Sequence, residues 1–270
     1  MSSITISTRA FTIGVALAVS FLGTHLSRAQ AQASGDDAEL RAIIDKAIKA
    51  HGGAEKLSQF KVVIAKWSGK HKVENVFYWD AVRTVSYEMP DKIRLDYEVM
   101  NPLNNTTFMF SRVVNGTKGW QGTAARGTRE LSEGDVNHIR DEFYAHWVAS
   151  TIPLLEKGYT YSPYGNFQVD GQDAVGIGVA FAGRPTINLC FDKKTGLVVK
   201  SERRTKDPRT QEEYTAESIY RDHKEFQGVM WPTGRQDRRD GMDLDEKSGL
   251  FELSDYRASE KLDEAALAKP

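Results

Sequence analysis

Short runs in which apolar and polar residues alternate recur along this chain, and they limit its fold more than any other feature. The clearest run extends from Lys92 to Val99, where every second residue is apolar and the residues between are charged. Such alternation gives a strand one apolar face and one wet face. Turn residues separate most runs at short spacing, and Asn115-Gly116 is the strongest hairpin signal. The pattern predicts an antiparallel sheet or open barrel rather than βαβ units.

Two one-sided helical patterns interrupt the predicted strands. The first covers residues 38–51 and stops at His51-Gly52-Gly53, where a glycine can take the left-handed conformation that ends a helix. The second covers residues 134–156, with Ser132 placed to cap it. Because each helix has one apolar stripe, we expect both on the concave side of one strongly curved sheet.

The first residues predict export. An uncharged apolar run from Ala10 to Gly23 follows Arg9, and it is shorter than the roughly 20 residues that span a bilayer. The small-residue sites Ala29-Gln30-Ala31 and Ala31-Gln32-Ala33 follow. We interpret residues 1 to about 31 as a cleavable signal peptide; the alternative, an uncleaved anchor, needs a longer apolar run. No cysteine lies near these sites, so we expect a periplasmic or secreted protein and not a lipoprotein.

The remaining chain is predicted to be one domain, residues 36–258, followed by a tail, residues 259–270. The whole chain has 36 Lys and Arg against 37 Asp and Glu, which provides no basic excess for a nucleic-acid partner. Cys190 is the only cysteine, so the fold has no internal disulfide. Between Leu189 and Phe191 in a strand pattern, Cys190 is expected to be a buried inert thiol rather than a nucleophile.

Motifs for catalysis and cofactors are missing. The sequence contains no HExxH, GxSxG or GxxxxGK[ST] motif, so we expect no enzyme activity, no catalytic residues and no cofactor. His138, Glu142 and His146 are spaced four apart on the second helix and could face a metal. Since they flank its apolar stripe with no third histidine nearby, we interpret them as solvated and expect no metal. Basic residues of the C-terminal half, such as Arg203 and Arg235, are likewise expected on a solvated sheet face.

Aromatic and aliphatic residues on the strands and the second helix are the candidate ligand-binding residues. These residues either fill a packed core or line an apolar pocket closed by the helices. A packed core and an apolar pocket are built from the same residue types. The pattern by itself favours the packed core. The candidates are Trp67, Phe77, Trp79, Ile93, Leu95, Tyr97, Phe108, Phe110, Phe143, Trp147, Ile187, Leu189 and Phe191.

Three segments resemble one family. Residues 189–200 (LCFDKKTGLVVK) are similar to a hairpin of LolA-like and LppX-like envelope proteins, the outer-membrane lipoprotein-sorting superfamily. Residues 114–120 (VNGTKGW) and 220–232 (YRDHKEFQGVMWP) resemble its "NG…GW" hairpin and a later strand pair. Together with the opening helix, the resemblance spans most of residues 38–256.

The resemblance implies a half-open antiparallel β-barrel with helices across its mouth, enclosing an apolar cavity. It implies an envelope protein that binds a lipid, an acyl chain or a lipoprotein, as carrier or chaperone, without catalysis. Its partners would be a lipid or acylated protein and membrane-bound donor and acceptor proteins. Two alternatives stay open: a regulatory protein of the same fold that senses or binds another envelope protein, and a hydrolase with dispersed catalytic residues.

The export prediction is testable on the protein itself. Amino-terminal sequencing of the protein from the cell envelope should give a chain that starts after residue 31 or residue 33, because the small-residue sites end there. A chain that starts at Met1 and stays in the membrane would contradict the prediction.

Overall fold

The computed structural model describes residues 37–270 except 74–76, 124, 209, 244–249 and 260, and leaves out the side chains of 72, 73, 77, 243, 250, 258 and 259. The predicted signal peptide therefore lies outside the described residues. Leu40–Pro270 form one compact unit. Among the described residues, every helix is too short or too polar to cross a membrane.

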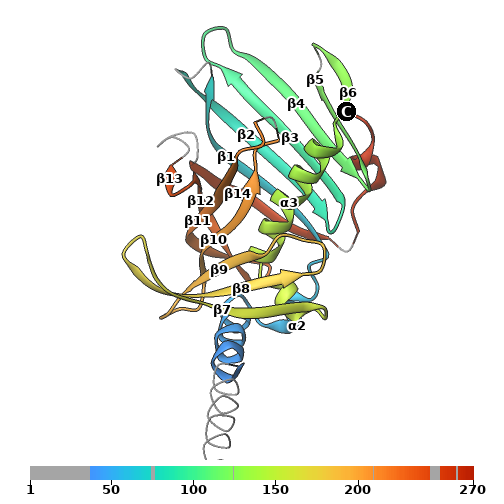
Figure 1. Cartoon of the computed structure of the whole chain (residues 1–270). Helices are drawn as coiled ribbons and strands as arrows, with labels where there is room; N and C mark the ends of the chain where they lie inside the picture. Colours follow the sequence, from blue (N-terminus) through green and yellow to red (C-terminus); the bar gives the residue numbers. More distant parts are fainter. Residues whose placement is uncertain (1–36, 74–76, 124, 209, 244–249, 260) are drawn as a thin grey trace, which may run out of the picture. The chain divides into compact units, whose positions relative to one another are not determined.

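The described strands form one antiparallel sheet (Figure 1). They are β1 (Val62–Val73), β2 (Phe77–Glu88), β3 (Lys92–Asn101), β4 (Thr106–Asn115), β5 (Lys118–Thr123), β6 (Gly127–Glu130), β7 (Tyr159–Val169), β8 (Gln172–Phe181), β9 (Ile187–Asp192), β10 (Val198–Lys206), β11 (Glu213–Phe226), β12 (Val229–Arg239), β13 (Met242–Asp243) and β14 (Leu250–Ser259). The order along the sheet is β6-β5-β4-β3-β2-β1-β14-β12-β11-β10-β9-β8-β7, with β13 beside β12. Because β6 and β7 lie at opposite ends of this order, the sheet is open.

One helix forces this sheet to curve. α3 (Glu133–Ala149) contacts β4 and β5 near one end of the strand order and β9 and β10 near the other (Figure 1). In a flat sheet β5 and β9, nine places apart, would be separated by about 43 Å. A helix of 17 residues is only about 25 Å long. The sheet therefore bends around α3, which confirms the predicted mainly β fold of a single curved, open antiparallel sheet with helices on its concave face.

Two buried clusters hold α3 in place. The first joins its residues Val136, Ile139, Phe143 and Trp147 to the inner face of the sheet from β1 to β3 and at β12 and β14. The second joins the opposite side of α3 to the helix at residues 40–50 and to β8, β9 and β10. Both predicted helices thus pack on the same side of the sheet.

The chain's last residues cover part of the outer face. The short 3₁₀ helix η2 (Glu264–Leu267) brings Leu267 and the preceding Leu262 against Val62 of β1 and Val113 of β4. Arg94 of β3 donates from Nη1 to the carbonyl oxygen of Ala266, 3.1 Å away. This part of the tail is therefore packed on the sheet through a short 3₁₀ helix.

Several local predictions are confirmed and others are corrected. Ser132 Oγ accepts a hydrogen bond from Asp135 N at 3.1 Å and caps α3 as expected. The predicted helix over 134–156 is shorter, because Thr151 adopts a left-handed conformation before the 3₁₀ helix η1 (Ile152–Leu155). The residue pattern from Lys224 to Trp231, taken alone, predicts one continuous strand, but Gln227 and Gly228, both with positive φ, form a hairpin there between β11 and β12, as the resemblance to a strand pair implies.

The helix at residues 40–50 ends in the predicted glycine cap. Gly53 N donates to Ile48 O at 2.9 Å, and Gly52 has a φ of +116°. A Cβ on Gly52 would collide with the carbonyl oxygen of Gly228 in the β11–β12 hairpin, and the nearby Met230 N donates to His51 O at 3.2 Å. The glycine is required both by its backbone conformation and by this close approach to the hairpin. The short helix α2 (Ala54–Leu57) follows.

Gly52→Ala should therefore destabilise the protein more than a glycine change that only strains the backbone. We expect G52A to lose about 2–5 kcal/mol of unfolding free energy, because an overpacking cost of about 1–3 kcal/mol adds to about 1–2 kcal/mol of left-handed backbone strain. Gly116→Ala is the matched control, because Gly116 also has positive φ but has open space around it. Urea unfolding measures both; equal losses would contradict the close-approach explanation.

Candidate functional site

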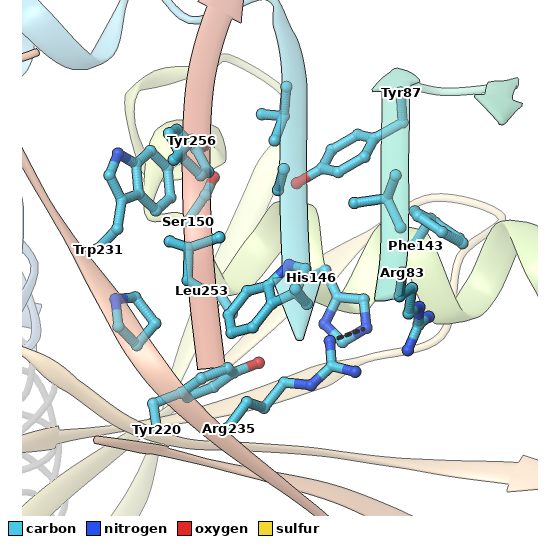
Figure 2. Close-up of a pocket in the computed structure, with 16 residues that line it drawn as sticks. Arg83, Tyr87, Phe143, His146, Ser150, Tyr220, Trp231, Arg235, Leu253 and Tyr256 are labelled. Carbon is cyan, nitrogen blue, oxygen red and sulfur yellow. Dashed lines mark hydrogen bonds between the residues drawn. The ribbon is translucent and has the colours of Figure 1, made fainter. Parts of the chain in front are cut away.

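A cavity of about 70 Å³ lies between α3 and the inner face of the sheet (Figure 2). Most of the side chains in its wall are aliphatic or aromatic. The four exceptions are Arg83, His146, Ser150 and Arg235. The lining residues are Val63, Ala65, Trp67, Arg83, Val85, Tyr87, Phe143, His146, Ala149, Ser150, Tyr220, Trp231, Pro232, Arg235, Leu253 and Tyr256. Several candidate residues thus surround this small cavity or pack in the clusters next to it.

Strand register builds the cavity wall. On β1, alternate residues from Val63 to Trp67 face inward, and they pair with alternate residues of β2 from Tyr87 back to Arg83. Ala65 lies opposite Val85 on one side and opposite Tyr256 of β14 on the other. Because side chains alternate across a strand, this register places one continuous set of side chains under α3. The small Ala65 leaves space where its neighbours are large.

Three basic side chains gather at one end of the cavity, as Figure 2 shows for Arg83, His146 and Arg235. Arg235 is only 7% exposed, and the side chain of Arg83 is 12% exposed. The Arg235 guanidinium also lies over the ring of Trp67, 5.4 Å from its centre. The cavity therefore has an apolar body and a buried basic end.

A hydrogen-bonded network joins this basic end to α3. Glu142 Oε1 accepts from Arg83 Nη2 at 3.0 Å. Arg235 donates from Nη1 to His146 Nε2 at 3.2 Å and from Nη2 to Asp237 Oδ2 at 3.0 Å. Since a guanidinium can only donate, His146 Nε2 is the acceptor and the neutral ring carries its proton on Nδ1.

The network shifts the titration of its members. Burial and the nearby Arg235 charge lower the pKa of His146 to about 3. Burial raises the pKa of Glu142, but attraction to Arg83, His146, Arg203 and Arg235 outweighs it and lowers this pKa to about 2. At neutral pH, Glu142 is therefore ionised and His146 is neutral.

Four buried polar atoms around the cavity have no hydrogen-bond partner among the described residues. They are Nε of Arg83, Nε of Arg235, Nε1 of Trp231 and the hydroxyl oxygen of Tyr256. Buried polar groups are nearly always paired in folded proteins, so these four atoms have hydrogen-bonding capacity left for a water molecule or another polar group.

Sequence reasoning missed the basic end. It placed Glu142, His146, Arg203 and Arg235 on solvated surfaces, and the structure corrects this: Arg203 and Arg235 are buried, and the other two face them. The period-two pattern of β12 held a signal, because Val229, Trp231, Thr233 and Arg235 share the buried face. The arginine was overlooked because a charged residue in such a series is normally exposed.

The structure divides the predicted ligand-binding residues among several places. Trp67 and Phe143 line the cavity. Ile93, Leu95 and Trp147 belong to the same buried cluster without lining it. Ile187, Leu189 and Phe191 lie in the second cluster with the helix at residues 40–50.

The remaining candidates lie toward the far end of β2, β3 and β4. Tyr97 and Phe110 stack with ring centres 5.0 Å apart, and Trp79 stacks on Phe108 at 6.1 Å. Phe108 is 55% exposed near the β3–β4 hairpin, so it contacts solvent as well as Trp79. Phe77 begins β2, and its side chain is among those not described.

Two potential nucleophiles in the core, Ser150 and Cys190, lie in structural surroundings. Ser150 Oγ donates to Trp147 O at 2.5 Å and accepts from Ile152 N. Cys190 is fully buried in β9, and burial raises the pKa of its thiol to about 12. No group of three metal-ligating side chains occurs among the described residues.

Stability should fall as the pH is lowered below about 6.5. The folded-state pKa of His146 lies below its ordinary value of 6.5, so its protonation favours unfolding as the pH falls toward 3. The folded-state pKa of Glu142 also lies below its ordinary value, so its protonation lowers the unfolding free energy further as the pH falls from about 4.5 to 2. His146→Gln should reduce the loss of unfolding free energy between pH 6.5 and 4.5 by on the order of 1–2 kcal/mol. Urea unfolding tests this, and identical pH slopes for the two proteins would refute it.

Known proteins provide fold comparisons only. No protein-family model matches the sequence, and no curated protein matches it. A LolA superfamily protein from Nitrosomonas europaea is 13% identical, with a TM-score of 0.49 over 85% of this chain and 97% of its own. An outer membrane lipoprotein-sorting protein domain from Vibrio parahaemolyticus is 13% identical, with a TM-score of 0.48 over 84% of this chain and 94% of its own. A DUF1329 family protein from Desulfovibrio piger is 12% identical, with a TM-score of 0.46 over 85% of this chain and 97% of its own.

Proposed function

We propose that this chain binds an acyl chain of a lipid or lipoprotein between α3 and the sheet, and that it acts as a carrier or chaperone in the cell envelope. The observation that carries the proposal is the cavity itself, which has an apolar wall, a buried basic end and unpaired polar atoms. An amphiphile combines the same two chemistries. The predicted signal peptide and the motif resemblance support an envelope location and this class of ligand.

The size of the cavity implies that it widens on binding. An engineered apolar cavity of about 150 Å³ holds one benzene molecule. The cavity under α3 measures about 70 Å³, which is too small for an acyl chain. Because α3 covers the cavity, we expect this helix to shift when the ligand enters. The ligand then replaces the contacts that Phe143 of α3 makes with the sheet.

The energetics allow such an exchange. Each buried CH₂ group contributes about 0.8 kcal/mol, so a chain of twelve carbons gains on the order of 10 kcal/mol before costs. Loss of motional freedom and the displacement of α3 remove much of that gain. The remainder suits reversible binding, which a carrier needs in order to release its ligand.

Filling the cavity should block binding. Ala65→Leu adds three carbon atoms to the wall at the point where β1, β2 and β14 meet. We expect at least tenfold weaker binding of a fluorescent fatty acid, because about 1.4 kcal/mol of lost contact already changes affinity tenfold. Fluorescence titration of the folded variant measures the change.

The control is Ala174→Leu, which overpacks a buried alanine in a different cluster behind β8 and β9. This variant should bind the probe like the wild type if it is folded, as circular dichroism shows. The proposal fails if the wild type binds no probe, or if A65L and A174L bind it equally well. Native mass spectrometry of the purified wild type should also detect co-purified lipid.

A further inference from the structure

We propose that Arg83 and Arg235 form a subsite for the anionic head group of the bound amphiphile, a carboxylate or a phosphate. This inference rests on the proposed function and adds the ligand's charge to it. The subsite lies at the basic end of the cavity, so the acyl chain would extend from it toward Trp231 and Tyr256 (Figure 2).

The two arginines have donors to spare. Each guanidinium carries five N–H groups. Arg235, only 7% exposed, donates to His146 and Asp237, and Arg83 donates to Glu142. The Nε atom of each arginine is buried without a partner among the described residues. Both side chains line the cavity, and these contacts use only one of the five N–H groups of Arg83 and two of those of Arg235.

The charge balance favours an added anion. Three buried arginines, Arg83, Arg203 and Arg235, act on Glu142, and Arg203 forms no ion pair within the described part of the chain. Arg83 pairs with Glu142 and Arg235 pairs with Asp237, whereas Arg203 has only longer-range attraction to Glu142 and to Asp141, which is itself paired with Arg184 at 3.8 Å. His146 adds no charge at neutral pH, because it accepts a hydrogen bond from Arg235. A buried charge that lacks a close partner is costly, and a bound anion relieves that cost.

Glu142 of α3 already binds one arginine of this subsite. Its carboxylate accepts a hydrogen bond from Arg83 Nη2 at 3.0 Å, although Glu142 does not line the cavity itself. Arginine binds carboxylates and phosphates through the same planar fork of donors. Since Glu142 belongs to α3, a head group that replaces it on Arg83 would also release one of the contacts that hold α3 on the sheet.

A purely structural role predicts a different response to mutation. If the arginines only tie α3 to the sheet, then Glu142→Gln should weaken the fold and the binding of every ligand alike. If they receive a head group, E142Q removes the competing carboxylate and strengthens the binding of anionic ligands alone. The direction of the change separates the two roles.

The experiment compares dodecanoate with methyl dodecanoate, which have the same acyl chain but differ in charge, and adds inorganic phosphate alone. For the wild type we expect dodecanoate to bind at least about tenfold more tightly than the ester, from charge-assisted hydrogen bonds. E142Q should bind dodecanoate several-fold more tightly and the ester unchanged. Arg83→Gln should lose the preference for dodecanoate while still binding the ester. Lys61→Gln, which removes an exposed surface charge, is the control and should behave like the wild type.

The outcomes are distinguishable. If neither the acid nor the ester binds, the proposed function itself fails and the head-group subsite fails with it. If both bind equally, or if E142Q weakens both equally, the acyl-binding function stands and the subsite is refuted. If inorganic phosphate alone binds as tightly as dodecanoate, the site recognises a free anion and the head-group assignment is wrong.

Discussion

The structure depends on the packing of α3 against the inner face of one open sheet. This helix contacts strands near both ends of the strand order, and a flat sheet could not reach it at both places. Phe143, Trp147 and their neighbours on α3 are almost fully buried, so separating helix and sheet would expose several large apolar side chains at once. Burial of each such side chain contributes about 1.5–3 kcal/mol to the free energy of folding. The curvature of the sheet follows from that burial.

Curvature also explains why charged residues are buried. Side chains that point inward from β2, β10 and β12 converge as the sheet bends, and α3 then closes over them. Arg83, Arg203 and Arg235 share their strand faces with apolar residues, yet at this end of the fold they meet Glu142 and Asp237. Removing one partner of such a cluster leaves an uncompensated charge, which costs more than the pair contributes. The basic end is therefore better suited to recognition than to stability.

Much of the fold could be predicted from local patterns. The alternation from Lys92 to Val99, the Ser132 cap and the Gly52-Gly53 helix end each depend on neighbours in sequence, and each is present in the structure. The residue pattern by itself does not reveal the hairpin at Gln227-Gly228, because its polar residues also fit a continuous strand with one wet face. Local signals failed where two local structures share one pattern.

The sequence by itself determined that this chain forms an antiparallel sheet with one-sided helices, because period and turn chemistry act between residues a few positions apart. Only the tertiary structure decided which side chains meet under α3. Arg83 and Arg235 are 152 positions apart, and Glu142 lies between them in sequence. Strand order and sheet curvature bring them to one cavity, and no local pattern encodes either. The apolar residues of the core could therefore be predicted from the sequence, whereas the buried basic end and the small size of the cavity could not.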